Sequence, residues 1–186
     1  MKTAEEYQLR GYLVPSRGVE SIRDISERVR AVLGIDQPPS LEVFLESLSI
    51  YGITVDVLED ELATVFSFGA EAVCVPEAAT IYLSEVTYSK ACANDPRTRF
   101  TIYHELGHFV LDHKKMLNRA NFRGAIKPYM DSEWQADQFA AELSMPLPII
   151  LAEGLYSPVK IRDRFAVSLP AAERRYKQLA KRGDIK

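Results

Sequence analysis

Two histidines and a glutamate near the middle of the chain have the spacing of a zinc-binding helix. Residues 101–109 read TIYHELGHF, which contains the pattern HExxH at His104, Glu105 and His108. Side chains four residues apart lie on one face of an α-helix, so His104 and His108 can direct their imidazoles at one cation, with Glu105 beside them. A catalytic zinc ion takes three protein ligands and keeps one position for water. The pattern therefore predicts a metal site that still lacks one ligand.

Two carboxylates further along the chain can complete this site. Glu133 and Asp137 are again four residues apart, and Glu133 follows His108 by 25 residues. One carboxylate can bind the metal while the other accepts the free ring N–H of a ligating histidine, which fixes that histidine's tautomer. The alternative reading of such a pair is a solvated acidic face. Because the pair stands beside an HExxH helix, we take Glu133 as the third ligand and Asp137 as the partner of one histidine.

These segments together resemble the paired signature of the ImmA/IrrE metallopeptidases. RFTIYHELGH at residues 99–108 matches the family's RFTxxHELGH helix, and EWQADQFAAELSMP at residues 133–146 matches its ExxAxxFAxxLLMP helix. The resemblance spans roughly residues 50–150. Ser144 replaces a leucine usual in the family, which concerns packing, and Tyr103 stands where a small residue is common.

The resemblance implies a zinc-dependent endopeptidase of bacterial or phage origin. Such enzymes cleave a helix-turn-helix repressor or antitoxin in a stress or mobile-element response. We expect Zn²⁺ on His104, His108 and Glu133 to activate a water molecule and to polarise the scissile carbonyl. Glu105 then takes the proton of the water and passes it to the leaving amine.

Two other classes of protein fit parts of the sequence. One is a non-proteolytic module, with or without metal, that regulates a DNA-binding partner by contact. Pure binding does not need a base at the position of Glu105, which argues against this class. The other is a transcription factor built on the C-terminal helices, whose sign would be salt-dependent DNA affinity.

The sequence does not identify the group that stabilises the oxyanion of the tetrahedral intermediate. His113 follows His108 by five residues, so we expect it to point away from the metal and to lie at the helix C-terminus, where the dipole favours it. Asp112 could support His108 or lie in solvent. With no spare histidine, a tyrosine, an arginine or a backbone N–H must assist the metal. The candidates are Tyr82, Tyr88, Arg123 and Tyr129.

The composition bounds the fold. A chain of 186 residues with 47% hydrophobic residues can bury a core and suggests one domain with a small appendage. We expect an α+β, zincin-like metallopeptidase core, in which a small, mainly antiparallel sheet packs on helices that include the HExxH helix and a second ligand helix. We place this domain at residues 1–156, followed by a basic helical segment at residues 157–186.

Apolar periodicity and end signals predict the elements. Asp95 and Pro96 begin the HExxH helix, and Asp131 or Ser132 caps the second ligand helix. Gly107 suggests that another backbone passes close by. A loop at 114–130 joins the two ligand helices. Further helices are expected at 17–33, from 41 to Gly52, near 148–153, at 159–165 and at 171–181, with strands at 53–57, 63–68, 72–75 and 80–83.

An exposed edge strand before the HExxH helix could pair with an extended peptide through backbone hydrogen bonds. The candidates for this edge are residues 72–75 and residues 80–83. The alternative is a sheet that only supports the helix.

Charge is distributed unevenly along the chain. Residues 157–186 contain nine lysines and arginines against three acidic residues, a local net charge of +6 in a chain whose total is −3. The last two helices have the rhythm of a helix-turn-helix, and the polar side chains of the second could face DNA. A solvated helical face is the more common meaning of this pattern, so direct DNA binding is the less favoured interpretation.

The remaining sequence features concern the location of the protein in the cell. The chain has no run of about 18 apolar residues and no apolar stretch after Lys2, so we expect neither a membrane span nor a signal peptide, and a cytoplasmic location. Cys74 and Cys92 lack the spacing of a zinc knuckle, and we expect small buried thiols without a role.

Overall fold

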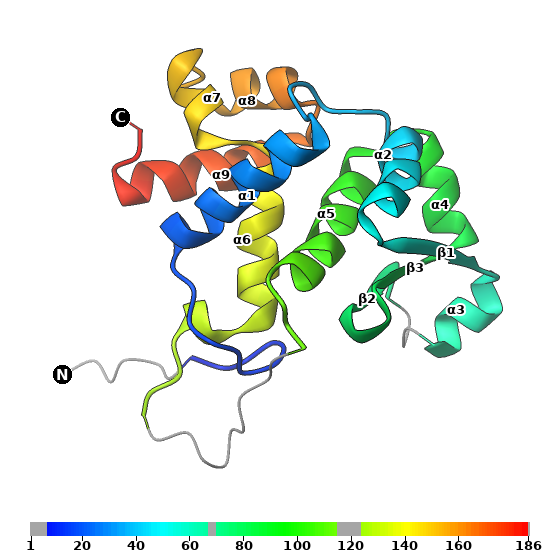
Figure 1. Cartoon of the computed structure of the whole chain (residues 1–186). Helices are drawn as coiled ribbons and strands as arrows, with labels where there is room; N and C mark the ends of the chain where they lie inside the picture. Colours follow the sequence, from blue (N-terminus) through cyan, green and yellow to red (C-terminus); the bar gives the residue numbers. More distant parts are fainter. Residues whose placement is uncertain (1–6, 67–69, 115–123, 186) are drawn as a thin grey trace.

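The HExxH pattern lies on helix α5 (Pro96–Val110), which is at the centre of an α+β fold (Figure 1). On one side α5 packs against α6 (Ser132–Ser144), which α1 (Val19–Leu33) contacts in turn. On the other side lie α2 (Leu41–Leu48) and a small sheet. The other elements are β1 (Thr54–Leu58), α3 (Asp60–Phe66), β2 (Ala72–Val75), β3 (Thr80–Ser84), α4 (Glu85–Cys92), α7 (Leu147–Ala152), α8 (Pro158–Phe165), α9 (Leu169–Arg182), and short 3₁₀ helices at Ser49–Tyr51, Pro76–Ala78 and Pro128–Met130.

This computed structural model describes residues 7–66, 70–114 and 124–185. Within those ranges, no helix is both long enough and apolar enough to cross a membrane.

Helix α1 ends at Gly34, and the 3₁₀ helix that continues α2 ends at Gly52, where the sequence predicted the end of the second helix. Gly34 and Gly52 adopt the left-handed conformation, with φ of 63° and 76°, which side chains with a Cβ rarely occupy. The start of α2 is held by a side chain from a distant part of the chain. Ser40 makes no capping hydrogen bond through its side chain, and the backbone N–H of Leu41 donates instead to Asn94 Oδ1 at 2.9 Å.

The sheet has three strands in the order β1-β3-β2 and is mixed. β2 pairs antiparallel with β3, as expected, but β1 pairs parallel with β3, so the prediction of a mainly antiparallel sheet is wrong for that pair. β3 is the central strand. Residues 80–83 are therefore not an edge, whereas the alternative edge at residues 72–75 is confirmed.

The strand predicted at residues 63–68 is also wrong. Residues 63–66 belong to helix α3, and residues 67 and 68 lie outside the described part of the chain. Short apolar runs do not distinguish strand from helix by periodicity. Asp60 and Glu61 in the first turn favour the helix, because carboxylates interact well with its N-terminal dipole.

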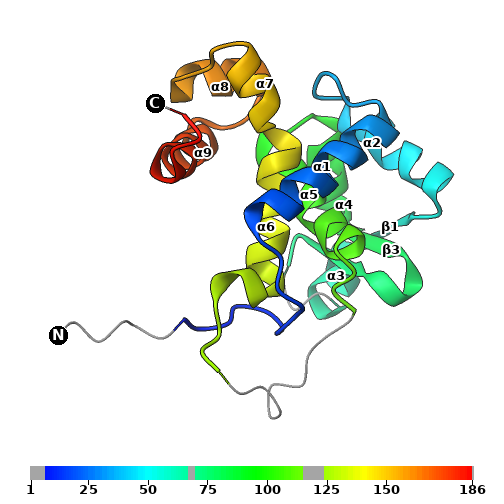
Figure 2. The same cartoon turned by 60° about the vertical axis from the view of Figure 1, so that its left-hand side comes forward.

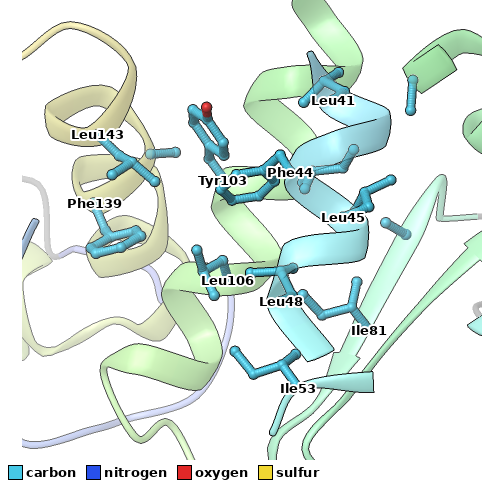
Figure 3. Close-up of a cluster of buried hydrophobic side chains, with 14 of the residues drawn as sticks. Leu41, Phe44, Leu45, Leu48, Ile53, Ile81, Tyr103, Leu106, Phe139 and Leu143 are labelled. Atoms are coloured by element: carbon cyan, nitrogen blue, oxygen red, sulfur yellow. The ribbon is translucent and has the colours of Figure 1, made fainter. Parts of the chain in front are cut away.

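The main core forms on both sides of α5 (Figure 3). Tyr103 and Leu106 of α5 lie between Phe139 on α6 and Phe44 on α2, and all four side chains are at most 2% exposed. Gly107 explains how close α5 and α6 come. A Cβ at this position would lie 3.0 Å from Phe139 Cδ1 and 3.3 Å from the Cα of Ala136. The close backbone approach predicted from this glycine is therefore confirmed.

Helices α7, α8 and α9 gather at one end of α6 (Figure 2), and a second cluster of buried apolar side chains joins them. It is connected to α6 by a buried ion pair. Arg175 of α9 donates from Nη1 to Glu142 Oε1 at 3.0 Å and from Nε to the carbonyl of Met145 at 3.0 Å. Both charged side chains are fully buried. Arg175 is therefore not available to face DNA.

We expect Glu142→Ala to lower the free energy of unfolding by about 3–5 kcal/mol, because it leaves the guanidinium of Arg175 buried without its partner. Urea denaturation measures this loss. Asp163→Ala removes an exposed carboxylate from a surface ion pair with Arg162 and should leave the denaturation midpoint near that of the wild type. Equal effects of the two substitutions would contradict the structural role of Glu142.

Candidate metal centre

Three side chains from α5 and α6 converge on one point. His104, His108 and Glu133 each bring a ligand atom within 4.8 Å of those of the other two. The Nε2 atoms of the two histidines are 3.1 Å apart. Glu133 Oε2 lies 3.2 Å from His104 Nε2, and Glu133 Oε1 lies 3.4 Å from His108 Nε2. The structure thus brings together the three ligands predicted from the sequence.

Helix caps fix the elements that carry these side chains. Asp95 caps α5 by accepting from the backbone N–H of Thr98 at 2.8 Å, as predicted. Asp131, one of the two predicted caps of α6, accepts from the backbone N–H of Glu133 at 3.0 Å. Glu133 therefore stands in the first turn of α6, where its carboxylate reaches across to α5.

An extended N-terminal segment lies over the start of α6, which the sequence did not indicate. The backbone N–H groups of Arg10 and Gly11 donate to the buried carboxylate of Asp131 at 2.8 and 3.1 Å. Gly11 also passes close to a candidate ligand. A Cβ there would lie 2.4 Å from Ser132 Oγ and 2.7 Å from Glu133 Cγ. A glycine at this position leaves the space that Glu133 occupies.

Asp137 contacts His104. Its Oδ1 lies 3.1 Å from His104 Nδ1, and its Oδ2 accepts from Arg10 Nη1 at 2.9 Å. Burial lowers the pKa of His104, but hydrogen bonds to Asp137 and Glu133 outweigh it and raise the pKa to about 10. His104 Nε2 faces the carboxylate of Glu133, so a cation bound between them would compete with a proton for this nitrogen.

His113 lies against His108, so the expectation that it points away from the site is wrong. Its Nδ1 lies 2.9 Å from His108 Nδ1, and its Nε2 lies 3.2 Å from Gln135 Oε1. The chain turns tightly after α5, with Asp112 at a φ of 57°, and this turn brings a residue five positions later back to the helix. His113 is a buried side chain, not a solvated residue at the helix end.

The hydrogen-bond network fixes the proton positions on this side of the site. Gln135 Nε2 donates to the carbonyls of Pro15 and Tyr129, so its Oε1 must accept from His113 Nε2–H. Burial lowers the pKa of His113, which keeps the ring neutral, and its Nδ1 then accepts from His108 Nδ1–H. The lone pair of His108 Nε2 is left facing Glu133 and His104. This is the tautomer that a metal ligand needs.

Glu105 lies beside the candidate ligands and contacts the edge strand. Its Oε2 accepts from the backbone N–H of Cys74 on β2 at 2.7 Å. Burial raises the pKa of Glu105 to about 7, while the charge of His104 and this hydrogen bond act in the opposite direction. A carboxyl with a pKa near neutrality can both accept and return a proton.

These contacts satisfy the requirements of a divalent metal site. Both histidines have their Nδ1 atoms held by other groups, and both Nε2 atoms face a carboxylate. Two imidazoles and one carboxylate form a donor set that suits zinc. The donors therefore fit the metal that the sequence predicts.

The structure does not single out one of the four candidates for stabilising the oxyanion. Tyr82 is on the central strand, Tyr88 is on α4, and the described contacts of Tyr129 involve its backbone carbonyl. Arg123 lies outside the described residues.

The cysteines are both free, but Cys92 is exposed, so its predicted burial is wrong. Burial raises the pKa of Cys74 to about 12, which makes its thiol unreactive.

The fold and site define a class: an α+β domain in which two packed helices present an HExxH motif and a carboxylate to one point. Comparison with family models gives the family. The model described as Peptidase_M78, IrrE N-terminal-like domain, matches residues 78–177, which is more than half of the chain. The chain therefore belongs to the ImmA/IrrE family, and this membership suggests a peptidase-related role.

A solved structure shares the fold at low sequence identity. A Mycobacterium tuberculosis transcriptional regulator is 17% identical, with a TM-score of 0.50 over 83% of this chain. The match covers 49% of the regulator, so the chain spans about half the length of that protein. The search of curated proteins found no match.

We expect His113→Ala to weaken metal binding about 10- to 100-fold, because His108 loses the acceptor that fixes its tautomer. Titration against a chelating dye measures the affinity. His113→Asn, whose amide oxygen can accept a hydrogen bond, should recover part of it.

Lys114→Ala is the matched control at the adjacent exposed position and should bind metal as the wild type does. Thermal unfolding of the metal-free proteins shows whether each variant folds. Unchanged metal affinity in a folded His113→Ala protein would reduce His113 to a packing residue.

Proposed function

We propose that the protein is a zinc-dependent endopeptidase that cleaves a helix-turn-helix repressor or antitoxin. The observation that carries this proposal is the convergence of His104, His108 and Glu133 beside the partly buried carboxylate of Glu105. Membership of a peptidase family supports the reaction class. The class of substrate follows from the resemblance of the paired helices to the ImmA/IrrE signature.

In this proposal His104, His108 and Glu133 hold the metal. A bound zinc ion would polarise the scissile carbonyl and lower the pKa of a water molecule. Asp137 contacts Nδ1 of His104, and His113 contacts Nδ1 of His108. These contacts keep each ligand in the tautomer that leaves Nε2 free for the metal.

Glu105 moves the proton. It accepts a proton from the attacking water and passes it to the nitrogen of the leaving amine, and its raised pKa favours both steps near neutral pH. Its hydrogen bond to Cys74 holds the carboxylate against β2. The group that stabilises the oxyanion is proposed to be a tyrosine, an arginine or a backbone N–H.

The edge strand β2 offers a place for an extended substrate. Cys74 directs its backbone N–H away from β3 and toward α5, and by the two-residue period of a strand Ala72 faces the same way. A peptide added along this edge would pass beside Glu105.

We further propose that residues 1–156 form the catalytic domain and that residues 157–186 form a basic helical segment.

Glu105→Gln should keep zinc and lose cleavage by about 10²- to 10⁴-fold, because the proton carrier is removed while the ligands remain. Glu133→Ala should lose zinc. Elemental analysis measures the metal, and intact-mass spectrometry follows repressors or antitoxins encoded beside this chain. Glu46→Gln changes an exposed carboxylate on α2 and should preserve both properties.

Undiminished cleavage by Glu105→Gln would refute the assignment of the base. If the wild type binds zinc and releases a repressor from DNA without cleaving it, the protein is the contact-only module instead.

A further inference from the structure

A groove of about 600 Å³ adjoins the candidate metal centre. It lies between the N-terminal end of α5, one face of α6 and the N-terminal half of α9, which crosses α6 near its C-terminal end (Figure 1). Its volume is within the range of sites that bind ligands or side chains. The lining includes Phe100, Trp134, Ala141, Met145 and Ala171, so much of the surface is apolar.

The groove is continuous with the site through α6. Asp137 lines the groove and also contacts His104. The groove is lined by Trp134, Asp137, Gln138 and Ala141 of α6 and by Met145 just after its end. Apart from the adjacent pair at 137 and 138 these positions are three or four residues apart, so they form one face of the helix. Glu133 and Met145 are about 18 Å apart along the axis, at about 1.5 Å per residue. About five or six residues of extended chain span that length.

Most of the charge in the groove is already paired. Asp137 is held by Arg10 and His104, and Arg175 is held by Glu142. Arg174 differs, because it is exposed and the structure shows no hydrogen bond or ion pair for it among the described residues. The charge that remains unpaired at the groove rim is therefore positive.

Arg97 adds to this positive rim. It is 81% exposed and approaches Glu71 only at 3.7 Å, a contact that contributes little. Arg97 and Arg174 come from α5 and α9, which form opposite walls of the groove. A carboxylate lying between these walls would meet a guanidinium, its preferred bidentate partner.

We propose that this groove docks a segment of the protein substrate in which carboxylates accompany apolar side chains. The proposal rests on the proposed peptidase function and assigns α9 to substrate recognition. Apolar side chains of the segment lie on the partly exposed Phe100, Trp134 and Ala171, and its carboxylates face Arg174. A nucleic-acid backbone fits this groove less well, because much of the lining is apolar.

The test uses the full chain with Glu105→Gln, loaded with zinc, so that no probe is cleaved. The probe is a fluorescent peptide of Leu-Glu-Ala-Glu repeats, followed by anisotropy. A Leu-Lys-Ala-Lys peptide and a short double-stranded DNA serve as the comparison probes. We expect the acidic peptide to bind at least about tenfold more tightly than the basic peptide. Equal binding of the two peptides, or displacement of the acidic peptide by the DNA, would overturn the proposal.

Two substitutions test the location. Arg174→Glu reverses the charge at the rim, and Ala171→Trp fills the groove from the partly exposed side of α9; each should weaken binding of the acidic peptide about tenfold or more. Lys177→Glu makes the same charge change on the same helix at an exposed residue that does not line the groove, and should weaken binding less than about threefold. Circular dichroism shows that each variant is folded. Loss of binding in Lys177→Glu equal to that in Arg174→Glu would refute a docking site in the groove.

Zinc content and cleavage, measured on the same substitutions with Glu105 intact, separate the two proposals. If cleavage depends on Glu105 but neither Arg174→Glu nor Ala171→Trp changes peptide binding or cleavage, the groove proposal fails and the peptidase stands. If no cleavage occurs but the acidic peptide still binds through Arg174, the peptidase proposal fails and the docking groove stands.

Discussion

The contact between α5 and α6 is the constraint on which the rest of the structure depends. Gly107 lets the two backbones approach so closely that a Cβ would lie 3.0 Å from Phe139 and 3.3 Å from the Cα of Ala136. This approach brings the carboxylate of Glu133 within 3.4 Å of both histidine Nε2 atoms. The buried apolar contacts of Tyr103 and Leu106 supply the stability that holds these polar groups in place.

Each candidate ligand is supported by a group from a distant part of the chain. Arg10 and Asp137 hold His104, His113 and Gln135 hold His108, and Gly11 leaves room for Glu133. Such supporting contacts fix tautomers and orientations before a metal binds, so less ordering remains to be done on binding. This arrangement buries several polar groups, each of which needs a hydrogen-bond partner. The helix caps and the backbone carbonyls around α6 provide such partners.

The sheet and the C-terminal helices extend the site in two directions. β2 places a backbone N–H against Glu105 and presents its outer edge toward α5. α9 is fixed to α6 by the buried pair of Arg175 and Glu142 and forms one wall of the groove beside Asp137. The proposed substrate therefore meets a strand edge at the centre of the site and a positively charged, apolar groove beyond it.

Local sequence determined which side chains could bind metal and which helices carry them. The spacing of His104 and His108 on one helix, the spacing of Glu133 and Asp137 on the next, and the caps at Asp95 and Asp131 all follow from the geometry of single helices and their ends. Only the tertiary structure decided the roles of His113, Arg10 and Gly11, the central place of β3 and the existence of the groove. These features depend on contacts between segments far apart in the chain or on a tight turn, and the periodicity of one segment carries no information about either.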